Sequence, residues 1–250
     1  MGKNKKTILL NGAFGRMGRT IVNVCKTSKE FEIKYALESP KHSRIGQGLY
    51  SAKDRKKYSL KNVLIDKSIK EFKVDFVVDF STPNSALRIA RKAYDFKIPF
   101  VTGTTGFSVT QLKNLQFLSK KIPILQSYNM SVGINVLLKI LKENIVYFKT
   151  TDIEITEKHH KNKIDSPSGT AILIGNTIRK SANKKFEIYI KSIRQGSIVG
   201  EHTVASFGNK ENIYITHEAL DRTIFANGAL IMGKKLLKKR RGFYSVLDLL

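Results

Sequence analysis

The chain has 250 residues, 41% of them apolar, and carries a formal net charge of +25. This length is enough for one large domain or two modest ones with a hydrophobic core. No apolar stretch approaches the ~20 residues that span a bilayer, and the run Ile8-Leu9-Leu10 is too short for the core of a signal peptide. Cys25 is the single cysteine, which excludes an internal disulfide. We therefore expect a cytoplasmic protein with no membrane segment.

The high positive charge first suggests a nucleic-acid partner, because basic surfaces neutralise phosphates. The lysines, however, are spread along the whole chain, and no RNP aromatic pattern, zinc-finger spacing or basic-zipper heptad is visible. Even the cluster at 234–241 is typical of a helix carboxyl end, where cations suit the helix dipole. We therefore favour a solvated basic surface without a nucleic-acid site, whose positive field would attract an acidic small molecule.

In the first half of the chain, short apolar runs alternate with amphipathic stretches, which is typical of a parallel sheet covered by helices. The expected strands are 7–10, 33–37, 76–80, 100–102 and 124–126. The expected helices are 16–26, 85–97 and 109–120, followed by a connecting helix at 135–148. The polar segment 44–59 has weak periodicity and is expected to be a loop.

The second half changes to alternating apolar and polar residues, which indicates a sheet with one face on a core and the other toward solvent or a cleft. The expected strands are 151–157, 186–193, 198–205 and 213–218. A helix at about 169–181 interrupts them, and a helix at 225–239 and an apolar tail at 246–250 follow. We expect a first domain at 1–130 and a second at 131–218, with 219–250 packing back on the first.

Gly12, Gly15 and Gly18 lie between the first strand and the first helix, with the spacing G-x-x-G-x-x-G. Glycines let this turn approach a pyrophosphate, which the helix N-terminus then binds, but a glycine loop alone is a weak signal. Glu38 strengthens it, because an acid at the end of the second strand, about 20 residues further on, is expected to bond the ribose hydroxyls of a dinucleotide. Arg16 could add a phosphate contact or be an ordinary exposed arginine.

Two more turns, at 103–106 and 127–130, follow expected strands. Ligands of doubly wound sheets bind outside the carboxyl ends of the strands, where such turns project. Each could also be a tight turn without a binding role, since glycine and asparagine are turn residues.

His159 and His160 follow an expected strand, and adjacent side chains of an extended segment point to opposite sides. One ring could therefore face a cleft as a proton donor while the other orients a substrate or binds a carboxylate. A metal site is disfavoured, because neighbouring strand positions do not chelate one ion easily and no cysteine or third histidine is close in sequence.

Lys163 adds a positive charge suited to a carboxylate, and it could donate a proton if burial lowers its pKa. Asp165 could orient Lys163 or simply occupy a turn. Ser168 is a plausible N-cap for a helix that starts here, and the N–H groups at such a helix start would form a carboxylate pocket. A nucleotide site in one half and a carboxylate site in the other together indicate a reductase.

These stretches resemble the bacterial dihydrodipicolinate reductase (4-hydroxy-tetrahydrodipicolinate reductase) family and cover nearly the whole chain in the family's order. The matching segments are G-A-F-G-R-M-G at 12–18, Glu38, D-F-S-T-P at 79–83, G-T-T-G-F at 103–107, N-M-S-V-G-I-N at 129–135, E-K-H-H-K-N-K-I-D-S-P-S-G-T at 157–170, V-G-E-H at 199–202 and F-A-N-G-A at 225–229. The run at 157–170 is highly specific.

The resemblance implies an α/β fold, with a Rossmann-type doubly wound parallel sheet and a smaller α/β substrate domain with a mixed sheet. It implies reduction of 4-hydroxy-tetrahydrodipicolinate to tetrahydrodipicolinate with NADH or NADPH, in diaminopimelate and lysine synthesis. By position, His159 and Lys163 would be the proton donors, and His160, Gly169 and Thr170 would hold the substrate carboxylates. The cofactor would be bound by Gly12, Ala13, Phe14, Gly15, Arg16, Met17, Glu38, Gly103, Thr104, Thr105, Ser127, Tyr128, Asn129 and Met130.

Two features depart from the family's pattern. Ser39 stands where members often have an arginine that meets the 2′-phosphate of NADP, although Lys41, His42 or Arg44 could take that role. The segment 189–200 is shorter than the family's usual loop, which contributes to subunit contacts in family tetramers. We expect a homo-oligomer, with the tetramer as the family's form. The main alternative is another two-domain reductase, such as an amino-acid dehydrogenase acting on a different imino acid.

Overall fold

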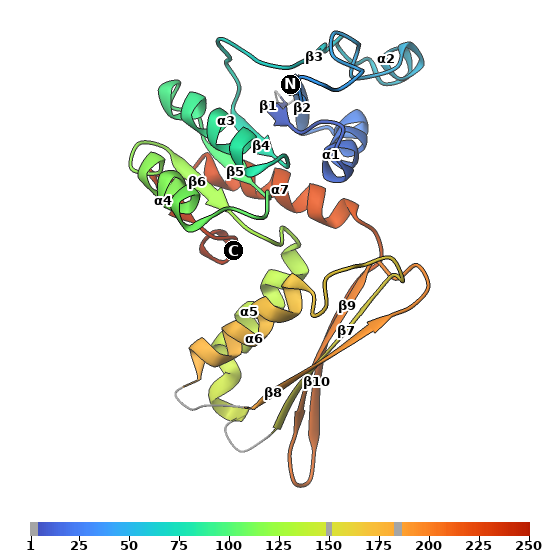
Figure 1. The fold of residues 1–250 in the computed structure, drawn as a ribbon, viewed down its shortest axis with the longest axis vertical. Coiled ribbons are helices and arrows are strands. Elements are labelled where there is room, and N and C mark those ends of the chain that lie inside the picture. The colour runs from blue at the N-terminus through green and yellow to red at the C-terminus, as the bar shows by residue number, and fades with distance from the viewer. Residues whose placement is uncertain (1–4, 149–151, 183–186) are drawn as a thin grey trace. The chain divides into compact units, whose positions relative to one another are not determined.

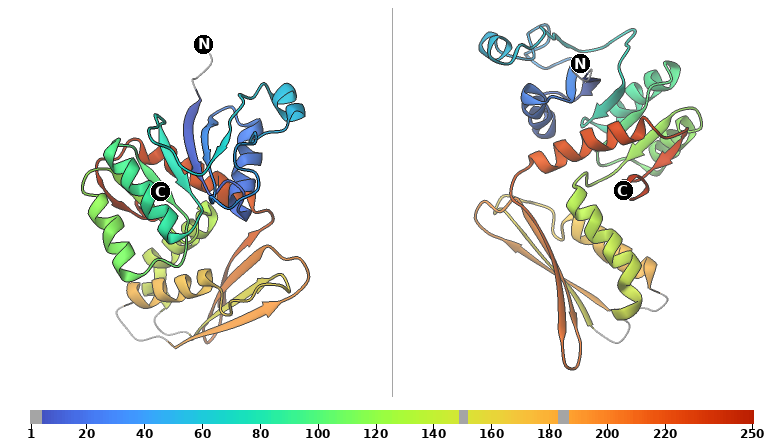
Figure 2. Two further views of the ribbon diagram at one scale, coloured as in Figure 1. Left: turned by 45° about the horizontal axis from the view of Figure 1, so that its top comes forward. Right: turned by 180° about the vertical axis from the view of Figure 1, so that it is seen from behind.

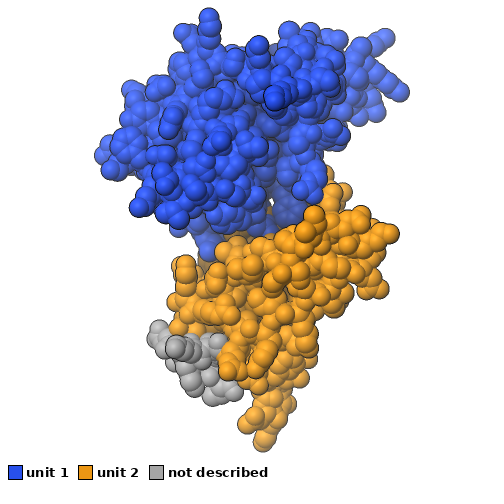
Figure 3. Space-filling model, viewed as in Figure 1, with its two compact units in different colours: residues 1–130, 225–250 blue, residues 131–224 orange. Residues whose placement is uncertain are grey.

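The computed structural model describes residues 5–148, 152–182 and 187–250 (Figure 1). The chain forms two compact units, which are described separately below (Figure 3). Unit 1 comprises residues 1–130 and 225–250, and unit 2 comprises residues 131–224. None of the helices in the described ranges has the length and apolar character needed to cross a bilayer.

Unit 1 is built on a seven-stranded sheet whose neighbouring strands all run parallel. Its strands are β1 (Lys6–Asn11), β2 (Phe31–Leu37), β3 (Ile65–Asp66), β4 (Phe76–Asp79), β5 (Phe100–Thr102), β6 (Pro123–Gln126) and β11 (Gly242–Tyr244). They lie in the order β11-β6-β5-β4-β1-β2-β3. The chain therefore builds outward from β1 on one side and returns to β4 on the other, and this reversal places a crevice outside the carboxyl ends of β1 and β4.

Helices cover both faces of this sheet (Figures 1 and 2). They are α1 (Arg16–Thr27), α3 (Pro83–Asp95), α4 (Val109–Leu118) and α7 (Thr223–Leu236). Successive residues of β4 point to opposite faces. Val77 packs in the core cluster formed with α3 and α4, whereas the ring of Phe76 lies against Gly233 of α7. Because both faces are buried, the central strands are continuous apolar runs rather than alternating ones.

The predicted Rossmann-type doubly wound sheet is confirmed, and all five strands predicted for this half are present. The prediction that 44–59 is a loop was wrong, because α2 (Ala52–Tyr58) lies within it. This helix begins at Ser51, whose Oγ accepts a hydrogen bond from the N–H of Asp54, and none of its residues is buried. A short helix without a buried face produces no apolar periodicity, so no helical signal is visible in this segment. Strands β3 and β11 were missed because each has only two or three residues.

Unit 2 contains a four-stranded mixed sheet in the order β10-β9-β7-β8. Its strands are β7 (Asp152–His159), β8 (Ile188–Arg194), β9 (Gly200–Phe207) and β10 (Asn212–Ala219). Only β7 and β8 pair in parallel. Two helices, α5 (Val132–Asn144) and α6 (Gly169–Ser181), lie together on one face of the sheet (Figure 1), and a short 3-10 helix (Ile145–Phe148) continues α5.

The predicted mixed sheet is also confirmed, with one adjustment that matters for the site. Strand β7 alternates between buried and partly exposed residues and extends to His159, two residues beyond its predicted end. Ile153, Ile155, Glu157 and His159 therefore share the face that α6 covers. The first residues of two predicted strands, Thr151 and Phe186, lie outside the described residues.

Candidate active site

The glycine loop joins β1 to α1 at the carboxyl edge of the unit 1 sheet. Gly12 has a φ of +84°, and a Cβ there would overlap the carbonyl of Phe80, so this turn requires glycine. Gly15 is different, because its φ is −60° and an added Cβ would meet nothing closer than 3.5 Å. Gly15 caps α1 without a side chain, which leaves the first N–H groups of this helix to an outside anion. This local geometry fits a pyrophosphate.

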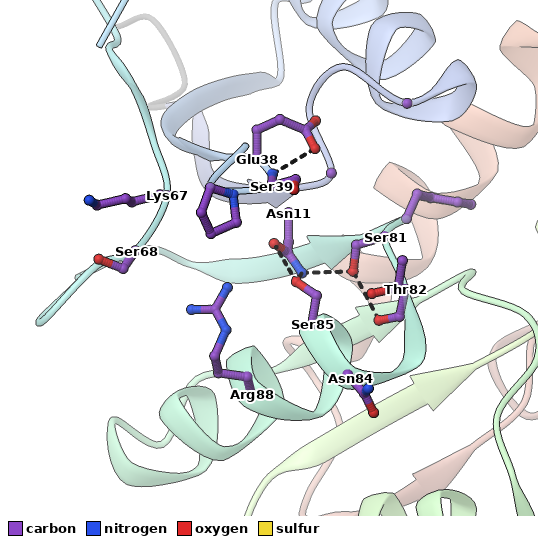
Figure 4. Close-up of a pocket in the computed structure, with 14 residues that line it drawn as sticks. Asn11, Glu38, Ser39, Lys67, Ser68, Ser81, Thr82, Asn84, Ser85 and Arg88 are labelled. Carbon is purple, nitrogen blue, oxygen red and sulfur yellow. Dashed lines mark hydrogen bonds between the residues drawn. The ribbon is translucent and has the colours of Figure 1, made fainter. Parts of the chain in front are cut away.

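An open cavity of about 760 Å³ lies beside this loop (Figure 4). Its lining residues come from the ends of β1, β2 and β4, from the segment after β3 and from the start of α3: Asn11, Gly12, Gly15, Glu38, Ser39, Pro40, Lys67, Ser68, Phe80, Ser81, Thr82, Asn84, Ser85 and Arg88. Of the predicted cofactor residues, Gly12, Gly15 and Glu38 line the cavity. The other members of the loop, Ala13, Phe14, Arg16 and Met17, are not among the described lining residues.

Glu38 directly follows β2 and lines this cavity. Its carboxylate accepts hydrogen bonds from the backbone N–H groups of Phe14 (2.7 Å) and Ser39 (2.8 Å). A carboxylate has lone pairs for further donors, so these two bonds fix its orientation and leave it able to accept ribose hydroxyls. The Phe14 ring stacks on His42 at 5.0 Å and lies 4.5 Å from the guanidinium of Arg44. Two of the three residues considered for a 2′-phosphate, His42 and Arg44, thus lie against the glycine loop.

Beneath the cavity, the buried carboxyl of Asp79 ties the ends of three strands together. It accepts hydrogen bonds from the side chains of Asn11 (2.7 Å), Ser81 (2.5 Å), Thr102 (2.6 Å) and Thr104 (2.7 Å). Burial raises the pKa of Asp79, although the four donors oppose this shift. Asp79 begins the motif D-F-S-T-P, which by itself does not indicate this role. It could have been found only as an acid at a strand end, which is a weak signal.

The turns after β5 and β6 lie at the same edge of the sheet but do not line the described cavity. The hydroxyl of Thr104 is committed to Asp79, and Gly103 packs against the ring of Phe80, where a Cβ would overlap it. Thr105 is exposed. In the second turn, Ser127 donates a hydrogen bond to the carbonyl of Asn129, while Asn129 and Met130 are buried and Tyr128 is 54% exposed. These residues shape the strand ends, and their contact with a cofactor stays a prediction.

In unit 2, the site is organised by a buried carboxylate, Glu157. Arg194 donates to both of its oxygens, at 2.6 and 2.9 Å, and the backbone N–H of Ser168 donates to one of them at 3.1 Å. Nδ1 of His159 is in hydrogen-bond contact with the other oxygen. Burial would raise the pKa of Glu157, but Arg194, Ser192 and His159 outweigh it and bring the pKa to about 2. Glu157 is therefore an anion throughout the physiological range.

Two imidazoles lie side by side in this site. The rings of His159 and His202 meet edge to face at 5.2 Å, and Nε2 of His202 is 3.1 Å from Oγ of Ser168. Burial lowers the pKa of His202 to about 3, so this ring is neutral. Burial also lowers the pKa of His159; hydrogen bonding to Glu157 opposes this shift, while the charges of Lys163 and Arg194 add to it. His202 ends the motif V-G-E-H, which by itself does not indicate a contact with His159.

The predicted substrate residues follow β7 in sequence. His160 is partly exposed, and its carbonyl accepts a hydrogen bond from the N–H of Lys163. The ammonium of Lys163 donates to both carboxylate oxygens of Asp165, at 2.7 and 2.8 Å. Lys163, and also the backbone of Gly169, lower the pKa of Asp165. Of the two roles considered for Asp165, the structure supports the pairing with Lys163.

Helix α6 begins at this point. Ser168 is its N-cap, as predicted, and its Oγ accepts a hydrogen bond from the N–H of Ala171 at 3.1 Å. Gly169 is exposed, and a Cβ there would meet nothing within 4 Å. A small anion can therefore approach the backbone of the first turn closely, and the helix dipole favours its charge.

A possible metal site must also be considered. Three potential ligand atoms, one each from Glu157, His159 and His202, lie within 4.8 Å of one another. The surrounding charges oppose this use. Both oxygens of Glu157 already accept hydrogen bonds from the guanidinium of Arg194, and the ring nitrogen nearest Glu157 bonds to it. A divalent cation would have to displace a bidentate ion pair, which is among the stronger contacts in proteins.

A doubly wound parallel sheet with a glycine turn at its switch point, followed by a separate mixed-sheet unit, is typical of two-domain pyridine-nucleotide-dependent oxidoreductases. Residues 6–130 match the family described as "Dihydrodipicolinate reductase, N-terminus", and residues 133–250 match "Dihydrodipicolinate reductase, C-terminus". The chain therefore belongs to the dihydrodipicolinate reductase family.

Individual relatives agree with this assignment. The 4-hydroxy-tetrahydrodipicolinate reductase of Buchnera aphidicola subsp. Cinara cedri is 38% identical, over 99% of this chain and 98% of that protein. The enzyme of that name from Caldanaerobacter subterraneus subsp. tengcongensis is 35% identical, over 97% of each. The structure of a dipicolinate-bound dihydrodipicolinate reductase from Paenisporosarcina sp. TG-14 superposes with a TM-score of 0.80 at 20% identity, covering 99% of this chain and 100% of that one. The last comparison shows a shared fold.

Proposed function

We propose that this protein reduces 4-hydroxy-tetrahydrodipicolinate to tetrahydrodipicolinate with NADH or NADPH, a step of diaminopimelate and lysine synthesis. Family membership over both units supports this activity. For the site, the proposal depends on one observation: the end of β7 and the segment after it gather imidazoles, an ammonium and the N-terminus of α6 in unit 2. These groups suit a dianion that must receive a proton.

Unit 1 is proposed to be the dinucleotide-binding domain. The N-terminus of α1 and the Cβ-free approach at Gly15 suit the pyrophosphate, and Glu38 suits the adenosine ribose. The turns at 103–105 and 127–130 are proposed to complete the cofactor site at the same sheet edge. When bound, the reduced nicotinamide supplies a hydride.

Unit 2 is proposed to be the substrate-binding domain. A substrate carboxylate would replace Asp165 as the partner of Lys163, and His160, Gly169 and Thr170 would hold the two carboxylates. His159 and Lys163 are proposed as proton donors, because the reduction consumes one hydride and one proton and releases one water. Glycine at 169 supports this binding mode, since the helix start is open to a ligand.

Dipicolinate is a planar dicarboxylate, and the related Paenisporosarcina structure is described as binding it. We propose that this chain binds dipicolinate at the same cluster of His160, Lys163 and the α6 N-terminus. Competition between dipicolinate and the substrate would support the proposal, whereas inhibition that is competitive only with NADH would contradict it.

A homo-oligomer, with the family tetramer as the expected form, is proposed to assemble through unit 2. The sheet face opposite α5 and α6 carries large apolar side chains that are exposed in the single chain: Tyr189 (57%), Ile193 (38%), Phe207 (38%) and Tyr214 (61%). Phe207 and Tyr214 already pack edge to face on neighbouring strands. Light scattering should report several chains per particle, and Tyr214→Lys should dissociate them. A monomeric wild type would contradict this.

The direct test of the activity supplies the product of the preceding synthase and follows the oxidation of NADH and NADPH separately. We expect turnover with at least one of them. Another imino acid reduced faster than this substrate would favour the alternative amino-acid dehydrogenase.

A further inference from the structure

Behind His159 lies a buried ion pair, Glu157 and Arg194, that is not among the groups proposed to touch the substrate. Both side chains are shielded, with exposed fractions of 0% for Glu157 and 18% for Arg194. Burying an ion pair costs desolvation energy that its attraction repays only with good geometry. Because this pair contacts a proposed proton donor, we look for its role in catalysis. That role depends on the function proposed above.

The backbone explains why these three side chains meet. Glu157 and His159 are two residues apart on β7, so they project from the same face. Arg194 is the residue that pairs with His159 across the parallel β7–β8 ladder. From there its guanidinium reaches both oxygens of Glu157 and also donates to the carbonyl of Asp165 at 2.7 Å. Arg194 thereby ties the strand to the loop that carries Lys163.

The contacts determine which nitrogen of His159 carries the proton. Glu157 is an anion and can only accept hydrogen bonds, so Nδ1 must donate whether the ring is neutral or charged. The nitrogen that changes its protonation is therefore Nε2. It lies 3.1 Å from where a Cβ of Gly200 would be, so a glycine at the start of β9 leaves room beside it.

We infer that Glu157 and Arg194 are positioning residues for His159: they hold its proton on Nδ1 and leave Nε2 as the atom that delivers the proton to the reduced substrate. Arg194 keeps Glu157 ionised, Glu157 orients the ring, and the ring performs the transfer. At each turnover Nε2 loses one proton to the substrate and regains one from solvent, so the positioning pair itself does not change its protonation.

The groups around His159 also couple its protonation to the substrate. The charged groups that face it are Glu157 on β7, Arg194 on β8 and Lys163 in the loop, while the neutral His202 lies on β9. Two cations and one anion, together with burial, favour the neutral ring. A bound dicarboxylate reverses this balance, so the ring becomes an acid when there is a substrate to protonate.

The test replaces Glu157 with glutamine and compares it with a matched control, Glu154→Gln. Glu154 lies on the same strand and pairs with Lys191 of β8 at 2.6 Å, but it lies on the opposite face from His159. We expect Glu157→Gln to lower kcat about 10²-fold, as for other residues that orient a catalytic histidine, with little change in the substrate KM. Glu154→Gln should retain wild-type kcat.

The pH profile separates positioning from a merely structural role. A proton donor is active below its pKa, so kcat falls as pH rises through the pKa of His159 in the substrate complex. Removing the Glu157 charge lowers that pKa, so in Glu157→Gln this alkaline decline must move to lower pH. A decline at the wild-type pH would overturn the inference. No turnover by wild type and Glu154→Gln alike would instead be a failure of the proposed function.

Imidazole nitrogen NMR tests the same inference without turnover. In wild type, the neutral ring of His159, assigned by comparison with His159→Gln, must carry its proton on Nδ1. The glutamine side chain can donate a hydrogen bond from its amide to Nδ1, so in Glu157→Gln we expect the proton to move to Nε2.

If Glu157→Gln fails to fold, Arg194→Lys is the second variant, because it keeps the charge but loses the bidentate geometry. It should show a lower kcat with little change in the substrate KM, because both charges remain beside His159 and only the bidentate geometry is lost. A wild-type ring protonated on Nε2 would overturn the inference.

Discussion

Asp79 in unit 1 and Glu157 in unit 2 are both fully buried carboxyls that organise a site, yet their pKa values move in opposite directions. Asp79 accepts hydrogen bonds from four uncharged side chains, and burial raises its pKa. Glu157 accepts from a guanidinium among others, and its pKa falls to about 2. The number of donors is similar, so the charge of the donors decides whether a buried carboxyl is an anion.

This difference matches what each site must bind. The cavity of unit 1 is shaped by glycines, backbone N–H groups and hydroxyls, which suit a nucleotide held by its shape and its phosphates. The site of unit 2 contains Arg194, Lys163 and two histidines, which suit a dianion that must be protonated. In unit 1 the buried carboxyl is a structural clamp, whereas in unit 2 it is proposed to control a proton.

The largest expected effect tests whether Glu157 and Arg194 act on catalysis through His159. His159→Gln should lower kcat by about 10²–10⁴-fold, the usual contribution of a general acid, while the Kd for NADH stays unchanged because the residues proposed to bind the cofactor lie in unit 1. In this background, adding Glu157→Gln should cost little more, since groups that act as one unit are not additive. Stopped-flow kinetics and NADH fluorescence titration measure the two quantities. Equal loss of turnover and NADH binding would contradict a role in proton transfer.

The opposite pKa shifts can also be tested by replacing each buried carboxyl with its amide and measuring the free energy of unfolding. Glu157→Gln should cost about 3–5 kcal/mol of unfolding free energy near neutral pH, because it leaves the buried charge of Arg194 unpaired. Asp79→Asn should cost less, about 1–2 kcal/mol, because the hydroxyls of Ser81, Thr102 and Thr104 can rotate to suit an amide. Hydrogen exchange read by mass spectrometry reports the two units separately. Equal losses would show that donor charge does not distinguish the two sites.

The pH dependence of the same variants gives a sharper form of this comparison. The lowered pKa of Glu157 stabilises the fold above pH 4.5, and this contribution is lost as pH falls toward 2. The difference in unfolding free energy between wild type and Glu157→Gln must therefore become smaller at acidic pH. The raised pKa of Asp79 stabilises the fold at pH values where this group is protonated. The difference in unfolding free energy between wild type and Asp79→Asn must therefore become larger at acidic pH. Hydrogen exchange across this range is the measurement, and parallel curves would contradict the assignment.

The sequence predicts the parts of this molecule that depend on local pattern. Alternating and continuous apolar runs located the strands, and the Ser168 cap located the start of α6. Glu157 could have been found too, because an acid two residues before a histidine on a strand shares its face. Arg194 could not, since it lies 37 residues away and meets Glu157 only through the β7–β8 register. Likewise, three segments that are distant in sequence meet at Asp79, and no local pattern predicts that they do.

The smallest expected effect adds one positive charge next to Glu38 in the cavity of unit 1. Ser39 lines the cavity next to Glu38, so the arginine of Ser39→Arg would lie where a 2′-phosphate on the adenosine ribose is expected. We expect the ratio of kcat/KM for NADPH to that for NADH to rise about tenfold, or about 1.4 kcal/mol. Ser68→Arg is the matched control, because Ser68 lines the same cavity from the segment after β3. If the arginine acts through a direct contact with the 2′-phosphate, Ser39→Arg changes the ratio and Ser68→Arg does not. Equal gains at both positions would mean that the cavity responds to its overall field, and an unchanged ratio at 39 would show that Glu38 does not mark the ribose.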